Sequence, residues 1–202
     1  MAGVPDRSQT LRVVVLISGT GSLLHAVLDA VGRGELDVAV AAVGADRAAP
    51  GLAYAEAAGI ATFVWPLSAA ADRAAWDWEL AERVAAHAPD LVVSAGFMRL
   101  VGPAFLARYG GRFINTHPAL LPAFPGVHGV RDALAYGVKV TGCTVFVVDE
   151  GVDTGPIIDQ AAVRVEAGDD ESGLHERIKV EERRLLVETL RRWPRPGSPG
   201  RP

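Results

Sequence analysis

The stretch LRVVVLISGTGSLL, residues 11–24, decides the fold class of this chain. Its first half is a short run of Val, Leu and Ile that is apolar on both faces, a pattern typical of a parallel strand covered on both sides. Glycines at positions 19 and 21 then separate this run from a segment with helical apolar spacing. We therefore predict a strand, a tight turn and a helix, the first unit of an α/β sheet.

The same alternation continues over the first half of the chain. Three further apolar runs follow, LDVAVAAVG (36–44), ATFVW (61–65) and LVVSAG (91–96). The segments between the runs are long enough for crossover helices, which parallel neighbours in one sheet require. These features predict a doubly wound, mostly parallel sheet with buried strands and helices on both faces.

The second half departs from this alternation. RFINTH (112–117), TGCTVFVVD (141–149) and PIIDQAAVRV (156–165) are predicted strands, and the last two are joined by a linker too short for a helix. We therefore expect an antiparallel C-terminal portion. A long amphipathic helix is predicted over 170–193. The prediction is one domain over 11–193, with flexible termini at 1–10 and 194–202.

Composition excludes several classes of protein. The chain of 202 residues has a formal net charge of −4, which provides no basic field for a nucleic acid. It contains one cysteine and no histidines at metal-ligand spacing, so we expect neither a disulfide nor a bound metal. Neither a leader nor a membrane-spanning run is visible, and we predict a cytoplasmic protein that acts on small molecules. A homodimer is left open.

The glycine-rich turn after the first strand has two interpretations. Gly19 and Gly21 allow a close backbone approach to a ligand, and the N–H groups that open a helix favour a phosphate. The turn matches neither of the two best-known phosphate fingerprints, because position 24 is Leu and no Gly-Lys pair is present. An ordinary strand-to-helix turn capped by Ser22 is equally supported.

The segment FINTHPALLPAFPGVHG, residues 113–129, contains a polar pair at a strand end. Asn115 and His117 share one face of the predicted strand because side chains alternate, and Pro118 ends the ladder. An amide and an imidazole side by side can stabilise a carbonyl oxygen that gains negative charge. The alternative is a structural asparagine beside a satisfied core histidine.

Further charged residues are more weakly informative. The turn that carries Asp149, Glu150 and Asp153 is most simply a solvated cap, although one of its carboxylates could keep a neighbouring imidazole in the cationic form. Lys179 and Glu182 lie one helical turn apart, where a surface ion pair is the simplest interpretation.

Together, the motifs VVVLISGTGSLL, LVVSAGFMRLVGPAFL, FINTHPALLPAFPGVHG and TGCTVFVVDEGVDTGPII resemble those of the phosphoribosylglycinamide formyltransferases, folate-dependent enzymes of purine synthesis. The resemblance runs in order from about residue 11 to about residue 190. Its most specific elements are the Asn-x-His-Pro run and the downstream Asp-x-Gly-Pro, marks of the transferases that use 10-formyltetrahydrofolate. It implies a Rossmann-like fold and transfer of a formyl group from 10-formyltetrahydrofolate, as co-substrate, to the amine of 5'-phosphoribosylglycinamide.

The resemblance also implies roles for individual residues. His117 matches the catalytic acid, Asn115 its partner at the formyl oxygen, and Asp153 the carboxylate that supports the imidazole. The position of Glu182 matches a helix carboxylate that meets the glycinamide. The ribonucleotide and its phosphate are expected at Gly19, Thr20, Gly21, Ser22 and Leu23. The folate is expected against Arg73, Met98, Arg99, Leu100, Val101 and Asn115.

Two positions depart from the family pattern, and two other readings stay open. Many relatives have Asn where this chain has Leu23, and His where it has Phe146. A formyltetrahydrofolate hydrolase or a methionyl-tRNA formyltransferase would share the catalytic residues, but each normally has an additional domain. A catalytically silent folate or nucleotide sensor would keep the fold alone, which the intact Asn115, His117 and Asp153 disfavour.

Overall fold

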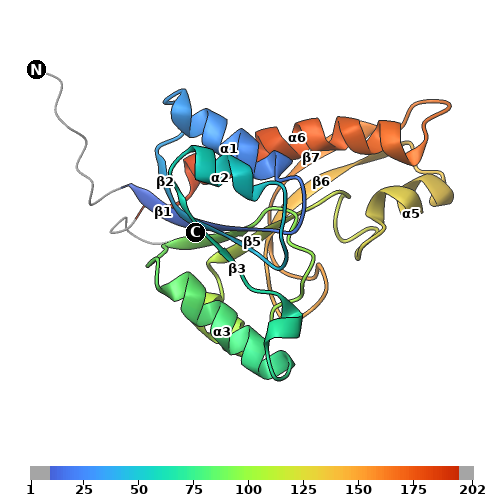
Figure 1. Ribbon diagram of the computed structural model, residues 1–202. Coiled ribbons are helices and arrows are strands. Elements are labelled where there is room, and N and C mark those ends of the chain that lie inside the picture. Colours follow the sequence, from blue (N-terminus) through green and yellow to red (C-terminus); the bar gives the residue numbers. More distant parts are fainter. Residues whose placement is uncertain (1–9, 196–202) are drawn as a thin grey trace, which may run out of the picture.

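The computed structural model describes residues 10–195, which form one seven-stranded sheet with helices on both faces (Figure 1). The strands are β1 (Leu11–Ile17), β2 (Val38–Ala45), β3 (Ala61–Val64), β4 (Leu91–Ser94), β5 (Phe113–His117), β6 (Val140–Val147) and β7 (Ile157–Arg164). The helices are α1 (Ser22–Gly32), α2 (Leu52–Ala57), α3 (Arg73–Ala85), α4 (Pro103–Tyr109), α5 (Gly129–Tyr136) and α6 (Glu171–Arg192), with a 3-10 turn at Leu67–Ala69. The strand order is β3-β2-β1-β4-β5-β6-β7.

The first five strands are parallel, which confirms the prediction for β1 to β4, whereas the sequence left the direction of β5 open. β1 lies between β2 and β4, with Val13 aligned with Val40 on one side and with Leu91 on the other. The predicted burial holds for β1 and β4 but is wrong for β3, where three of the four residues are exposed. β3 ends the sheet and has one neighbouring strand, so that its apolar side chains are only partly covered.

The C-terminal portion is antiparallel, which confirms the prediction for β6 and β7. The β5–β6 pair is antiparallel too, with Asn115 opposite Phe146 and His117 opposite Thr144. The sequence did not predict this second reversal. The connection between β5 and β6 contains α5 and is long enough for a parallel crossover as well.

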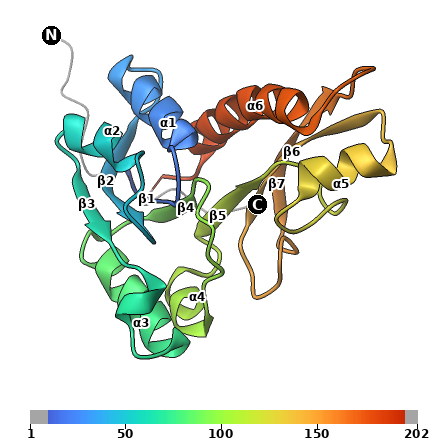
Figure 2. The same ribbon diagram turned by 45° about the vertical axis from the view of Figure 1, so that its right-hand side comes forward.

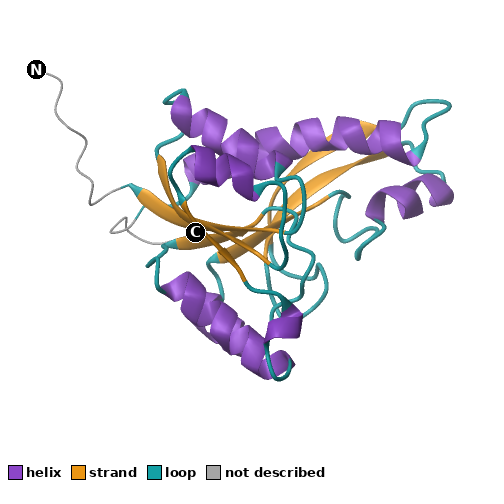
Figure 3. Ribbon diagram, viewed as in Figure 1, coloured by secondary structure: helices purple, strands orange, loops and turns teal. Residues whose placement is uncertain are grey.

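Two hydrophobic cores flank the sheet. Helices α1, α2 and α6 lie on one face, and α3 and α4 lie together on the other (Figures 1 and 2). Figure 3 shows the same layers, with the long α6 running beside α1. The predicted stripe of α6 is buried against the sheet, and Asp170 begins this helix by accepting a hydrogen bond from the Gly173 amide at 2.7 Å.

The ends of the chain leave part of the prediction untested. The flexible termini predicted at 1–10 and 194–202 lie outside the described residues, except for residues 10, 194 and 195. The single domain over 11–193 stays a prediction, although all seven strands join one sheet. Within residues 10–195, no helix is both long and apolar enough to cross a membrane.

Candidate active site

The polar pair predicted on β5 lies at the carboxyl end of this strand, where parallel α/β sheets place their ligands. Asn115 is half-buried and His117 is 4% exposed, and both occupy the face opposite to Thr116. The side chain of Thr116 instead makes a hydrogen bond with Glu182 of α6. The alternation expected from sequence therefore directs the amide and the imidazole toward one side of the strand end.

The imidazole of His117 is held between two acceptors. Its Nδ1 atom lies 3.4 Å from Oδ2 of Asp153, and its Nε2 atom lies 2.7 Å from the carbonyl oxygen of Phe124. A carbonyl oxygen can only accept, so we assign a proton to Nε2. Asp153 Oδ2 also accepts a hydrogen bond from the Gly126 amide at 2.7 Å. Histidine, carboxylate and proline-rich loop thus form one connected unit.

The carboxylates of the acidic turn after β6 make different contacts. Asp149 Oδ1 accepts hydrogen bonds from the Gly151 amide at 3.0 Å and from the Thr154 hydroxyl at 2.8 Å, so this residue is the turn cap. Glu150 is exposed. Asp153 has a φ of 55°, in the left-handed region, and is the carboxylate that reaches His117. The cap interpretation therefore holds for Asp149 and fails for Asp153.

The loop after β5 is fixed by two residues that sequence reasoning missed. The hydroxyl of Thr144 donates to the Ala119 carbonyl at 2.7 Å and accepts from the Leu121 amide at 3.0 Å. The side-chain amide of Gln160 donates to the Leu121 carbonyl at 2.9 Å and to the Thr144 hydroxyl at 3.0 Å. The pattern of a threonine on one strand and a glutamine on the next has no recognisable local signal.

The glycine turn before α1 is shaped for close approach. Gly21, with φ of 72°, is the N-terminal cap residue of α1 and makes no side-chain capping bond. Ser22 is the first helical residue, so the alternative of a Ser22 cap is wrong. A Cβ atom on Gly21 would lie 2.9 Å from Cα of Gly51, whose amide donates to the Gly19 carbonyl at 3.1 Å. The first N–H groups of α1 therefore have no side-chain cap.

The other residues of this predicted phosphate loop differ in exposure. Gly19 and Thr20 are exposed, and Ser22 is half-buried. Leu23 is 8% exposed and packs in the core beside α6, so that only its backbone amide is available to a ligand. Phe146, the second departure from the family pattern, is 2% exposed and lies opposite Asn115 across the β5–β6 pair.

The predicted folate-side residues form a wall after β4. Met98 and Leu100 are 66% and 61% exposed, while Val101 packs against the core below. The guanidinium of Arg73 donates to the Leu100 carbonyl and lies over the Trp76 ring, 4.8 Å from its centroid. The structure therefore brings Arg73, from the start of α3, to the wall from which it is distant in sequence.

Two buried carboxylates, neither identified from sequence, hold the wall at its ends. Asp46, just beyond β2, accepts from Arg99 Nε at 2.7 Å. Asp77 of α3 accepts from the Gly102 amide at 2.5 Å and from the Phe105 amide at 3.0 Å, which caps α4. Burial would raise the pKa of Asp46, but hydrogen bonds from Arg47, Ser18 and Arg99 outweigh it and hold this pKa at about 2.

The structure also corrects the prediction for Glu182 on α6. It is 6% exposed, and Lys179 instead bonds to Glu176 at 2.7 Å, so the surface ion pair predicted between Lys179 and Glu182 is wrong. Burial raises the pKa of Glu182 to about 7, against the opposing effects of the Thr116 hydrogen bond and the Lys179 charge. The described contacts do not join Glu182 to His117 directly; Thr116 lies between them along β5.

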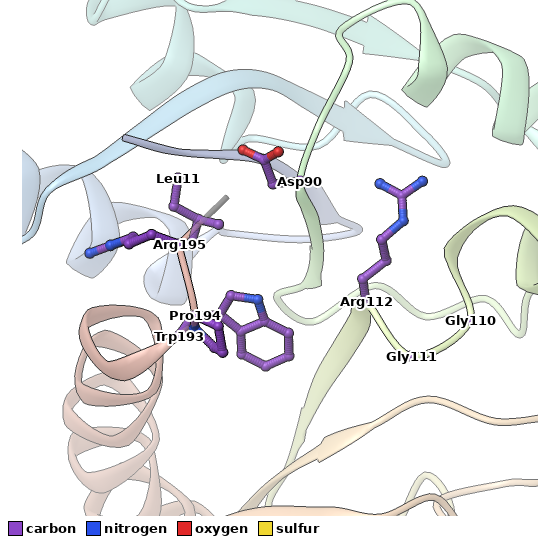
Figure 4. Close-up of a pocket in the computed structure, with 8 residues that line it drawn as sticks. All are labelled: Leu11, Asp90, Gly110, Gly111, Arg112, Trp193, Pro194 and Arg195. Atoms are coloured by element: carbon purple, nitrogen blue, oxygen red, sulfur yellow. The ribbon is translucent and has the colours of Figure 1, made fainter. Parts of the chain in front are cut away.

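A hollow at the amino ends of β1, β4 and β5 takes no part in this arrangement. Its volume is about 460 Å³, and Figure 4 shows Asp90 and Arg112 across from Trp193 and Arg195. Asp90 already accepts from the Arg12 amide at 2.8 Å, and Arg112 donates to the Pro89 carbonyl at 2.7 Å. These charged groups stabilise the amino ends of the strands. Among residues 10–195, no group of three or more His, Cys, Asp or Glu is arranged to hold a metal ion.

Comparisons with known proteins identify the family of this chain. The formyl transferase family model matches residues 11–190. Phosphoribosylglycinamide formyltransferase of Mycobacterium tuberculosis (strain H37Rv) is 59% identical over 180 residues, which cover 89% of this chain and 83% of the relative. The Escherichia coli (strain K12) protein of the same name is 45% identical over 173 residues, covering 85% and 82%.

Solved structures give the same assignment. Glycinamide ribonucleotide transformylase 1 from Symbiobacterium toebii superposes with a TM-score of 0.88 at 48% identity, covering 90% of this chain and 86% of that structure. A formyltetrahydrofolate deformylase from Pseudomonas syringae has a TM-score of 0.85 at 30% identity, covering 91% and 61%. The chain therefore belongs to the formyl transferase family and, within it, to the phosphoribosylglycinamide formyltransferases.

Proposed function

We propose that this enzyme transfers the formyl group of 10-formyltetrahydrofolate to the amine of 5'-phosphoribosylglycinamide by direct attack at the end of β5. The observation that carries the proposal is the His117–Asp153 contact of 3.4 Å beside Asn115 on the same face of the strand. The amine attacks the formyl carbon, and the tetrahedral oxyanion receives hydrogen bonds from the Asn115 amide and the imidazole. A proton then reaches the departing folate nitrogen.

The imidazole proton that His117 presents to the substrate starts on Nε2. In the structure this nitrogen bonds to the Phe124 carbonyl, so the substrate must exchange that hydrogen bond for its own. Asp153 acts through the other ring nitrogen, because its carboxylate lies 3.4 Å from Nδ1 and fixes the orientation of the ring. One oxygen of Asp153, Oδ1, has no hydrogen-bond partner among the described residues. We assign to this oxygen a water that removes the proton lost by the attacking amine.

The two substrates approach this centre from different sides. The phosphate of the ribonucleotide lies on the backbone N–H groups of Gly19 to Leu23, where α1 begins without a side-chain cap. Glu182 meets the glycinamide moiety from the α6 side of β5. The folate lies against Met98 to Val101, and its glutamate tail meets the guanidinium groups of Arg73 and Arg99. Asn115 belongs to both the donor site and the catalytic centre.

We infer that the protein works in the cytoplasm. Cys143 is a free, buried thiol, and burial raises its pKa to about 12. A thiol in this state is inert, in keeping with a role in core packing and with the reducing cytoplasm predicted from sequence. The partners are the two small-molecule substrates, and a homodimer stays a prediction.

One assay separates the transferase from the hydrolase that shares its fold. Loss of 10-formyltetrahydrofolate is measured with and without 5'-phosphoribosylglycinamide, and the formylated ribonucleotide is quantified at the same time. A transferase consumes the donor only when the ribonucleotide is present and forms one product molecule per donor consumed. Consumption at the same rate without ribonucleotide would assign the chain to the deformylase activity instead. The absence of turnover under both conditions would leave a binding protein.

A further inference from the structure

A row of three polar side chains crosses the antiparallel part of the sheet. His117 on β5 is paired with Thr144 on β6, and Thr144 is paired in turn with Gln160 on β7. Residues that lie directly opposite each other in an antiparallel pair project from the same face of the sheet. The row therefore leads from the candidate catalytic imidazole to the edge strand of the sheet, where Gln160 is exposed.

The two outer members of the row share a complete set of hydrogen bonds with the loop after β5. The side-chain amide of Gln160 donates to the Thr144 hydroxyl at 3.0 Å and to the Leu121 carbonyl at 2.9 Å. The hydroxyl also accepts from the Leu121 amide and donates to the Ala119 carbonyl. Its one proton and both of its lone pairs are thus in use. Because a carbonyl only accepts, the amide nitrogen of Gln160 must face Leu121.

These bonds hold the first half of a loop whose second half holds the imidazole. Residues 119–121 bond to Thr144 and Gln160, and three residues later the Phe124 carbonyl oxygen lies 2.7 Å from Nε2 of His117. Phe124 has a φ of 55°, in the left-handed region, which a bulky residue adopts only where its surroundings enforce it. The place of this carbonyl therefore depends on restraints from outside its own segment.

The imidazole and this carbonyl are closely enclosed. A Cβ atom on Gly129, where α5 begins, would lie 3.0 Å from Nε2 of His117 and 3.1 Å from the Phe124 carbonyl oxygen. The Gly126 amide, two residues after Phe124, donates to Oδ2 of Asp153, the atom that lies 3.4 Å from Nδ1 of the imidazole. A shift of the loop would therefore change the contacts of both ring nitrogens at once.

We propose that Gln160 is a positioning residue for the reaction, which acts through the Thr144 hydroxyl and the loop to orient the His117 imidazole. It touches neither substrate, and no bond is made or broken at this residue. The inference rests on the proposed formyl transfer, because His117 is the group that Gln160 positions. Since Gln160 is exposed on an edge strand, its side chain can be replaced without opening a cavity in the core.

The test removes the two amide donors and keeps the length of the side chain. Gln160→Met cannot donate a hydrogen bond, and Gln160→Glu, when ionised, turns an acceptor toward the Leu121 carbonyl. Asp159→Ala is the control, because Asp159 is the preceding residue of β7 and its carboxylate bonds to Arg192 of α6 rather than to the loop. All three variants should keep the thermal midpoint of wild type within a few degrees.

Two measurements separate positioning from a structural role. In steady-state kinetics with each substrate varied, both Gln160 variants should lower kcat by about two- to tenfold, the factor that corresponds to one neutral hydrogen bond, and leave both KM values unchanged. NMR without substrates should find the proton on His117 Nε2, which the Phe124 carbonyl holds, at a different chemical shift and in faster exchange with water than in wild type. Asp159→Ala should match wild type in both measurements, and the loss of the signal in His117→Asn assigns it.

The outcomes separate this inference from the function on which it rests. If Gln160→Met keeps the kcat and the His117 signal of wild type, or if Asp159→Ala changes both to the same extent, the inference is refuted and the formyltransferase function stands. A raised KM for one substrate at unchanged kcat would make Gln160 a binding residue, and a lowered thermal midpoint at unchanged kcat would make it a structural one; each overturns the inference. If wild type forms no formylated ribonucleotide, the proposed function fails, whereas the NMR comparison still decides whether Gln160 orients His117.

Discussion

Replacing Glu182 by Gln should change how the stability of this protein depends on pH. The carboxyl group is 6% exposed, and burial raises its pKa from 4.5 to about 7. In the unfolded chain the group titrates near its ordinary value. Below pH 4.5 it is protonated in both states, so its neutral form is buried at no ionisation cost. As pH rises toward 7, the unfolded state releases the proton first, and stability is lost.

The size of this effect follows from the two pKa values. A difference of about 2.5 units, at about 1.36 kcal/mol per unit, corresponds to about 3 kcal/mol in the free energy of unfolding. Most of this loss, about 2 to 3 kcal/mol, falls between pH 5 and pH 8. Glutamine has nearly the same shape and no proton to release. The stability of Glu182→Gln relative to wild type should therefore increase by about that amount over the same interval.

Urea unfolding at several pH values measures the difference directly, because all other titrating groups are common to both proteins. Thr116→Val provides a companion variant. The Thr116 hydrogen bond opposes the rise in the Glu182 pKa, so its removal should move the titration to higher pH. If the wild-type and Glu182→Gln curves stay parallel from pH 5 to pH 8, the carboxyl group ionises alike in the folded and unfolded states, and the assignment of a buried, neutral acid is refuted.

Three further predictions concern the catalytic centre and its substrates. Gly21→Val places a Cβ atom within 2.9 Å of Gly51 at a φ of 72°, so ribonucleotide affinity should fall by about tenfold or more while folate affinity is kept; equal loss of both would indicate misfolding. Asp153→Asn should lower kcat by ~10²-fold. The double variant with His117→Asn should have a kcat little lower than that of the poorer single variant. If the two losses in kcat multiply instead, the pair does not act as a unit. Arg73→Gln should raise the KM for the folate donor about two- to fivefold and leave the ribonucleotide KM unchanged, and steady-state kinetics with each substrate varied would expose an equal effect on both.

The sequence predicted those parts of the site that depend on local order. The face shared by Asn115 and His117 follows from strand periodicity, and the glycine turn at Gly19 and Gly21 follows from its place between a strand and a helix. The resemblance of its motifs to a known family also identified Asp153, Arg73 and Met98 to Val101 as candidates. The structure brings Asp153 to His117 and Arg73 to Leu100, and their roles stay predictions.

Packing of the whole chain sets which charged groups are buried and which residues meet across the sheet. The i and i+3 spacing of Lys179 and Glu182 suggests a surface pair, but spacing does not show which side of a helix the sheet covers. The Glu182 side chain lies on the buried face of α6 and makes a hydrogen bond with Thr116. The partners of Asp46 could not be predicted for the same reason, because Ser18 and Arg99 follow other strands of the sheet. Periodicity is a property of one segment, whereas the ionisation and partners of a side chain are set by segments that folding brings from elsewhere in the chain.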